Sequence, residues 1–494
     1  MNPPVLKKLY KTTVAIAWAL LFLTLPVTSF PFFPGGLGGK TLVRPLAVYP
    51  LIILVVLITI PRLFSRPLPR TFLPLFAFII VAFISSIAAF SFDIEALRGV
   101  SIESRFLRNI ITLGIGSAFY LTISLLHQTR EDLNFSLRWL YTGFAIALVW
   151  GTLQALYVIY FSPQYFDLIS EVQSLISTRK LFPTRISGLT YEPKWFAEQI
   201  SFLLLPWLLG SIITKRSVFQ WRFKWLTVEW ILLAWSVVVV AFTFSRTGLF
   251  MLAALSFLAF LLYRSHSGDR SGSSSGRPAK KRSRRFLEAA LITLAVLIFT
   301  ITIGAQNRYI SRFWRYWTDD RPARKTYLEY IGFQQRFVYW QTALRTFEEF
   351  PLLGVGLGNY AYYFDEMLPN QTYNRQPEIV RQITPVEGRN RLITPKNLYA
   401  RLLAETGLIG TVIFTAFVIA VLGCALFLWY SDAPEQRFWG LSGILGLFVF
   451  LFVIFSYDSF ALPNMWVIFG ITTAAAHLSE PAQLKSIEPA VQTR

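Results

Sequence analysis

Apolar runs of about 20 residues recur along the whole 494-residue chain and alternate with short polar segments. A helix of that length crosses a hydrocarbon core of roughly 30 Å. Buried helices of a soluble protein could imitate one such run, but not the whole series. The pattern therefore predicts an all-α, polytopic membrane protein with about 12 transmembrane helices. The predicted spans are residues 13–30, 44–60, 71–90, 109–127, 139–161, 197–213, 226–244, 247–263, 286–304, 398–430, 438–456 and 460–477.

Basic residues are concentrated in alternate loops between these spans. The most basic segment is the Ser/Gly-rich linker 264–285, which contains a single acid, Asp269. Lys and Arg are enriched in cytoplasmic loops of membrane proteins, so we expect this linker and both chain termini to lie in the cytoplasm. Because the linker is rich in Ser and Gly, we also expect it to be disordered. The loop 162–196, the tight turn at Ser245-Arg246 and the long segment 305–397 would then face outward.

Composition agrees with the membrane class. The chain is 54% hydrophobic and 16% aromatic, with a mean hydropathy of +0.49, and carries 15% charged residues against about 25% in soluble proteins. The net charge of +20 is explained by cytoplasmic loops, so we expect no nucleic acid partner. One cysteine, Cys424, and three widely separated histidines exclude a disulfide within the chain and a zinc constellation. We expect neither a metal nor a cofactor.

The long outward segment contains two aromatic stretches with helical periodicity. FVYWQTALRTFEEF at 337–350 places Trp340, Leu344 and Phe347 on one face, which predicts an amphipathic helix on the bilayer surface. RYISRFWRYW at 308–317 mixes Arg with aromatic residues. Such a mixture can stack nucleic acid bases, but beside a membrane we interpret it as an interfacial anchor.

Four segments on the expected outward side combine charged residues with glycine turns next to apolar runs. They are RISGLTYEPKWFAEQI (185–200), FTFSRTGLF (242–250), QQRFVYWQTALRTFEEFPLLGVGLGNY (334–360) and TPKNLYARLLAETGLIG (394–410). Together they resemble the O-antigen ligase and O-antigen polymerase family over about residues 180–425. The family pattern is His-Asn, nine residues and Gly-x-x-Gly; Asn397, Gly407 and Gly410 fit it, whereas Lys396 replaces the His.

The resemblance implies a glycosyltransferase in a bacterial inner membrane, with its outward side in the periplasm. Such enzymes move a glycan from a polyprenyl diphosphate lipid to an acceptor sugar, either on a lipid A core or on another lipid-linked repeat. The sequence leaves ligase and polymerase open, and the replaced His favours a polymerase or a divergent polysaccharide enzyme. Membrane lipids and these two glycans are the expected partners.

Charged residues in the four segments are the candidates for chemistry. Arg246 interrupts a long apolar stretch, and its guanidinium could bind the diphosphate and stabilise the charge of the leaving group without a metal; the alternative is an Arg that snorkels to the head groups. Arg185 and Arg336 are candidates for the same role. Lys396 could bind phosphate or act as a base. Glu192 is then the candidate base, or an acid that merely favours a helix N-terminus.

Two other readings of the function remain open. Twelve spans with cytoplasmic termini also suit a transporter or flippase, although the single long outward segment makes the chain lopsided. The change at Lys396 also allows a catalytically inactive relative. The string GVGLGN at 354–359 lacks a surrounding βαβ unit, so we interpret it as a flexible turn and not as a dinucleotide site.

Overall fold

A computed structural model describes residues 3–33, 42–224, 226–269, 308–318, 326–369 and 392–491, together with residues 302, 379, 380 and 384. These residues are mostly helical, as predicted. The first half contains α1 (Pro3–Leu23), α2 (Val48–Leu54), the π-helical turn η2 (Val55–Thr59), α3 (Ile60–Ser65), α4 (Phe72–Ala88), the short η3 (Ala89–Ser91), α5 (Ile102–Leu126), α6 (Arg130–Ile159), α7 (Pro163–Ile176), α8 (Pro193–Gln199), the π-helical turn η4 (Ile200–Leu204) and α9 (Leu205–Thr214). The second half contains β1 (Arg222–Phe223), β2 (Leu226–Thr227), α10 (Val228–Phe242), α11 (Arg246–Asp269), α13 (Arg308–Thr318), α14 (Tyr327–Tyr330), α15 (Gln334–Glu349), α16 (Tyr360–Tyr363), α18 (Leu398–Trp429), α19 (Pro434–Val453) and α20 (Asn464–Val491).

Seven of the described helical segments are long and apolar enough to cross a membrane. They are Val48–Ser65, Phe72–Ser91, Ile102–Leu126, Arg130–Ile159, Pro193–Thr214, Leu398–Trp429 and Pro434–Val453. The shorter apolar helices Val228–Phe242 and Arg246–Leu262 coincide with two more predicted spans. The predicted span 286–304 lies outside the described residues. The membrane class is therefore supported, while the total of about 12 spans stays a prediction.

Large apolar side chains on the outer faces of the bundle agree with a lipid environment. Leu73 and Phe76 of α4 are 73% and 48% exposed, and Val412 and Ile419 of α18 are 56% and 61% exposed. Water would disfavour so large an apolar surface, whereas lipid tails accept it. The interior between the helices is also apolar, and Trp207 and Trp466 are completely buried there.

Three local features differ from the sequence expectations. The loop 162–196, which was expected to face outward, contains the helix α7, which begins at Pro163, a residue favoured in a first helical turn. A small antiparallel hairpin pairs Arg222 with Thr227, so the described chain is not purely helical. Helix α11 extends to Asp269, and the remainder of the predicted linker 264–285 lies outside the described residues.

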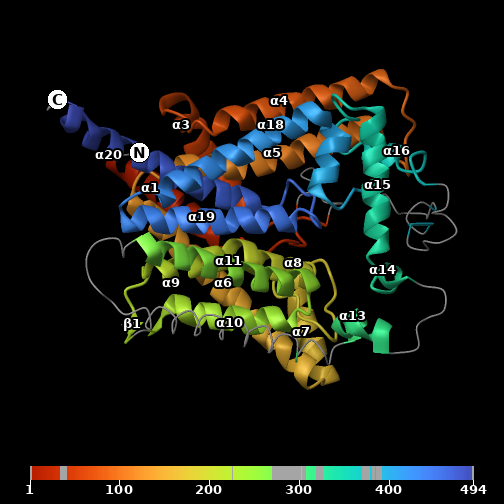
Figure 1. Cartoon of the computed structure of the whole chain (residues 1–494), viewed down its shortest axis with the longest axis horizontal. Coiled ribbons are helices and arrows are strands. Elements are labelled where there is room, and N and C mark those ends of the chain that lie inside the picture. Colours follow the sequence, from red (N-terminus) through yellow and green to blue (C-terminus); the bar gives the residue numbers. More distant parts are fainter. Residues whose placement is uncertain are drawn as a thin grey trace.

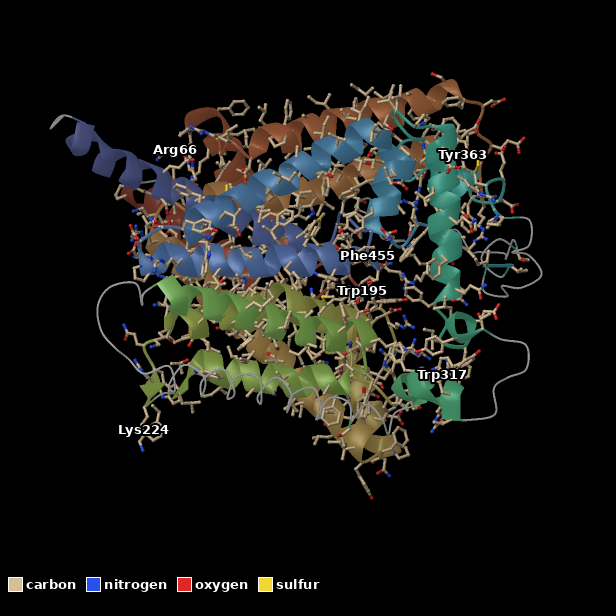
Figure 2. All side chains as sticks on the ribbon, viewed as in Figure 1. Arg66, Trp195, Lys224, Trp317, Tyr363 and Phe455 are labelled. Atoms are coloured by element: carbon tan, nitrogen blue, oxygen red, sulfur yellow. The ribbon has the colours of Figure 1, made fainter. Side chains whose placement is uncertain are left out.

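The two ends of the bundle are built differently. Figure 1 shows both chain termini and the β-hairpin at one end, whereas α13, α14, α15 and α16 lie at the other. The labelled residues Arg66 and Lys224 mark the first end in Figure 2, and Trp195, Phe455 and Trp317 lie toward the second. Helix α15 confirms the predicted helix at 337–350 and lies across the end of the long helices (Figure 1).

Helix α15 packs against the protein through a face that the sequence did not single out. Its buried residues include Val338, Tyr339 and Ala343, which lie toward α18. On the face predicted to lie on the bilayer surface, Leu344 is 46% exposed, whereas Trp340 is partly buried against the same cluster. The contact of this face with a bilayer stays a prediction.

Candidate functional site

Two of the predicted cations, Arg185 and Arg246, meet at the turn between α10 and α11. The Arg185 Nε donates a hydrogen bond to the Thr243 carbonyl at 2.9 Å, and the Ile186 N–H donates to the Phe242 carbonyl at 3.3 Å. Arg246 begins α11 immediately after this turn. The segment 185–186 is therefore paired with the end of α10, which brings the two arginines to the same end of the bundle.

Arg246 extends from its turn toward the outer helices. Its Nη1 donates to the Ile331 carbonyl, at the end of α14, at 2.8 Å. Its guanidinium carbon lies 4.5 Å from the centre of the Phe313 ring in α13. These contacts hold the side chain at the junction of α11, α13 and α14.

The other two predicted cations, Arg336 and Lys396, also lie together. The Arg336 Nη1 donates to the Lys396 carbonyl at 3.3 Å. The Lys396 ammonium lies 3.3 Å from the Tyr339 hydroxyl and 4.4 Å from the centre of that ring. A cation over an aromatic face is stabilised by the ring quadrupole. Residues of α15 thus contact both the backbone carbonyl and the side-chain ammonium of Lys396.

Asp458, which the sequence analysis did not single out, fixes the backbone of Lys396. Lys396 has a left-handed conformation, with φ of 53°, which is unfavourable for a residue with a long side chain. Its N–H donates to the Asp458 Oδ2 at 2.7 Å. Asp458 lies in the loop between α19 and α20, 62 residues further along, and no local sequence pattern relates it to Lys396.

Glu192 forms its ion pair with Arg179 and not with any of the four predicted cations. It precedes Pro193 at the start of α8. Two residues later, Lys194 donates to the Ser456 carbonyl at 2.8 Å and lies 3.4 Å from the buried carboxylate of Glu198. Because Ser456 is close in sequence to Asp458, this contact connects the start of α8 with the loop that holds Lys396.

A buried charge network lies beneath Lys396, inside α18. The Arg401 Nε donates to the Glu405 Oε2 at 2.7 Å, and both side chains are almost completely buried. The Arg401 Nη2 also donates to the Asn109 Oδ1 of α5 at 3.0 Å. Charged residues within an apolar helix are costly and generally have a structural or functional role. The spacing of Arg and Glu by four residues is the sequence signal that could have identified this pair.

The Gly-rich segment 354–359 forms a turn after α15, as predicted, but this turn is largely buried and hydrogen-bonded to α18, which does not agree with a flexible one. It enters a break in α18, where Gly407 has non-helical φ and ψ of 63° and −165°. The Val355 and Gly356 N–H groups donate to the carbonyls of Ala404 and Glu405 at 3.0 and 2.9 Å. The break in α18 therefore binds the segment that follows α15.

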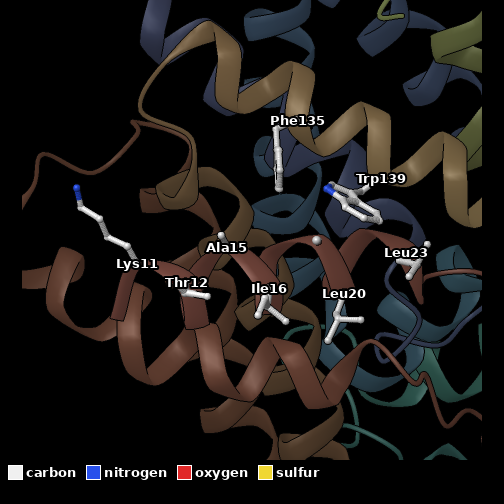
Figure 3. Close-up of a pocket in the computed structure, with 9 residues that line it drawn as sticks. Lys11, Thr12, Ala15, Ile16, Leu20, Leu23, Phe135 and Trp139 are labelled. Atoms are coloured by element: carbon white, nitrogen blue, oxygen red, sulfur yellow. The ribbon is translucent and has the colours of Figure 1, made fainter. Parts of the chain in front are cut away.

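An apolar groove lies away from all of these residues, between α1 and α6. It has a volume of about 540 Å³ and is lined by Leu20, Leu23, Phe135 and Trp139, among others (Figure 3). Lys11 stands at one edge of it (Figure 3). Within the described ranges, no group of three or more His, Cys, Asp or Glu side chains is placed to hold a metal ion.

The fold places this chain among polytopic helical membrane proteins. Arg246 contacts α13 and the end of α14, Arg185 is bonded to the turn before Arg246, and Arg336 of α15 is bonded to Lys396; α13, α14 and α15 lie at one end of the bundle (Figure 1). Residues 231–415 match the model of the O-antigen ligase family. This match covers less than half of the chain. The search of curated proteins found no match to the chain. The family match confirms the resemblance and supports, in general terms, a membrane glycosyltransferase of ligase or polymerase type.

Proposed function

We propose that this protein transfers a glycan from a polyprenyl diphosphate lipid to an acceptor sugar at the periplasmic face of a bacterial inner membrane. The observation that carries the proposal is the arrangement of four cations in two pairs at one end of the bundle. Arg185 and Arg246 share the 243–246 turn, and Arg336 is bonded to the Lys396 carbonyl. A diphosphate presents several anionic oxygens, which suit guanidinium and ammonium donors.

The proposed reaction is a direct displacement that needs no metal. An acceptor hydroxyl oxygen forms a bond to the anomeric carbon of the donor glycan. The bond from that carbon to the diphosphate oxygen breaks, and the electron pair leaves with the polyprenyl diphosphate. Arg246 would bind the leaving oxygens with support from Arg185, since fixed cations stabilise charge that develops in the transition state.

Lys396 and Glu192 have separate proposed roles. Lys396 would bind a phosphate oxygen, because an ammonium at the edge of α15 can do so without any change of its charge. Glu192, whose side chain is 36% exposed, would orient the acceptor hydroxyl and take its proton. Its ion pair with Arg179 supports this assignment by holding the carboxylate in place at the start of α8.

The proposed orientation puts the cation pairs in the periplasm and both termini in the cytoplasm. The location of the termini at the opposite end from α15 supports it (Figure 1). The test uses a variant in which Cys424, the single cysteine, is replaced by Ala. In spheroplasts, a membrane-impermeant thiol reagent should label Thr318→Cys and leave Arg66→Cys unlabelled. The opposite labelling would contradict the proposed orientation.

The transfer reaction itself is tested with the purified full chain in detergent or vesicles. The protein is incubated with a polyprenyl-diphosphate glycan, with and without a lipid A core acceptor. Growth of lipid-linked chains indicates a polymerase, and transfer to the core indicates a ligase. Movement of the donor across vesicles without transfer would instead favour a flippase. No reaction, in a preparation that binds the donor, would favour an inactive relative.

A further inference from the structure

Four aromatic rings from α13 and α14 form a cluster, which we call the aromatic platform: Tyr316, Trp317, Tyr327 and Tyr330. The Tyr316 ring is at its centre, with ring centres 5.1 Å from Trp317, 5.3 Å from Tyr327 and 5.6 Å from Tyr330. Trp317 lies 5.7 Å from Tyr327. Although it contacts this cluster, Trp317 is 61% exposed, so a large part of its indole is accessible from outside.

The aromatic platform is continuous with the candidate site through Arg246. The Tyr327 hydroxyl donates to the Phe313 carbonyl at 3.1 Å, and the Arg246 guanidinium lies 4.5 Å from the centre of the Phe313 ring. Arg246 also donates to the carbonyl of Ile331, the residue that follows Tyr330. A ligand bound by Arg246 therefore has its next binding surface on α13 and α14.

We propose that the aromatic platform binds sugar rings of the glycan, with Trp317 as the principal stacking residue. A pyranose has an apolar face of C–H groups and a rim of hydroxyls. The exposed indole matches that apolar face. The proposal rests on the proposed function, because it is the diphosphate held at Arg246 that would bring a sugar next to these rings.

The arrangement of the rings favours a glycan over a bilayer surface as the occupant. Aromatic residues that anchor a protein at a membrane interface form a belt around it at the level of the head groups. Here Trp317 and Tyr327 contact one central ring, Tyr316, in edge-to-face geometry with interplanar angles of 85° and 68°. The result is a local cluster beside one functional side chain.

The experiment measures glycan binding apart from catalysis. The probe is the lipid-free oligosaccharide released by mild acid from the host's own polyprenyl-linked glycans, titrated into the full-length protein in detergent. We expect Trp317→Ala to weaken binding about two- to tenfold, the range for loss of one aromatic contact. Trp317→Phe keeps a ring and should bind better than Trp317→Leu, which keeps only apolar volume. Trp221→Ala removes an indole that is 51% exposed next to the β-hairpin, at the opposite end of the bundle, and should bind as the wild type does.

The outcomes separate this proposal from the proposed function. Absence of binding by the wild type, or unchanged binding by Trp317→Ala, would overturn the platform. Equal binding by the Phe and Leu variants would also overturn it. If the wild type binds the oligosaccharide but transfers no lipid-linked glycan, the platform stands and the proposed transfer fails.

Discussion

Replacing Gly407 by Ala should destabilise the protein strongly, because two requirements at this position exclude a side chain. The backbone there has φ of 63° and ψ of −165°, a combination that is almost restricted to glycine. A Cβ at this position would lie 2.3 Å from the Leu352 carbonyl oxygen and 2.4 Å from its carbon. Both atoms belong to the backbone, so rotation of a side chain cannot relieve the overlap.

The expected cost follows from these contacts. The backbone conformation alone accounts for about 1–3 kcal/mol. The Leu408 and Ile409 N–H groups donate to the carbonyls of Pro351 and Leu352 at 2.8 and 3.2 Å, and movement of this segment would lose both bonds. At about 1 kcal/mol each, the total decrease in the free energy of unfolding is about 3–5 kcal/mol.

The assay is denaturant-induced unfolding of the full chain in detergent micelles, followed by far-UV circular dichroism. Gly423→Ala is the matched control in the same helix, because a Cβ there would meet nothing within 4 Å. Alanine is the better helix former by up to about 1 kcal/mol, so the control should be neutral or slightly stabilising. Equal stability of the two variants would refute the idea that the break in α18 depends on glycine.

The remaining predictions concern the candidate site. Arg246→Ala should lower the turnover of glycan transfer about 10²- to 10³-fold while the protein still accumulates in the membrane, and Arg246→Lys should restore little, because a point charge lacks the bidentate fork. Lys396→Arg should keep donor binding and activity, whereas Lys396→His should weaken donor binding; an inactive Arg variant with intact donor binding would make Lys396 the base. Glu192→Gln should lower turnover about 10²- to 10⁴-fold with little change in donor affinity, and full activity would remove Glu192 as the base. Asp458→Ala should lower the free energy of unfolding by about 1–3 kcal/mol, since the Lys396 N–H loses its acceptor, while Asp458→Asn should stay close to the wild type.

The helices and their ends could be predicted because their signals are local. Apolar runs indicated α4 and α19 within four residues, whereas α5 and α6 begin seven and nine residues before the predicted spans 109–127 and 139–161, because their first turns are polar. The predicted boundary at Asn397 is a helix cap in which its Oδ1 accepts from the Ala400 N–H at 3.1 Å. Arg246 was identifiable for the same reason, since a charge inside an apolar run is visible without any structure.

Contacts between distant segments could not be predicted in this way. Asp458 follows the apolar run of α19 as an ordinary loop acid, and only the fold brings it to the Lys396 N–H. The Glu192–Arg179 pair joins two positions 13 residues apart, both of which follow α7 in the sequence. The packing of Val338, Tyr339 and Ala343 of α15 toward α18 could not be predicted either, because periodicity alone does not tell which side of a helix meets the protein.

The Gly-rich segment and the glycines of the 394–410 segment form one structural unit, although they are separated in sequence. The segment after α15 donates to the carbonyls of Ala404 and Glu405, and the break at Gly407 offers the N–H groups that bond to Pro351 and Leu352 in return. The N-terminal part of α15 is fixed separately, by the bond from Arg336 to the Lys396 carbonyl. Because α15 is attached to α18 at both ends, the spacing between Lys396 and Gly407 determines how Arg336 lies relative to Lys396. Loss of the break should therefore affect the cation pair as well as stability, and donor binding by Gly407→Ala should fall even under conditions in which the variant remains folded.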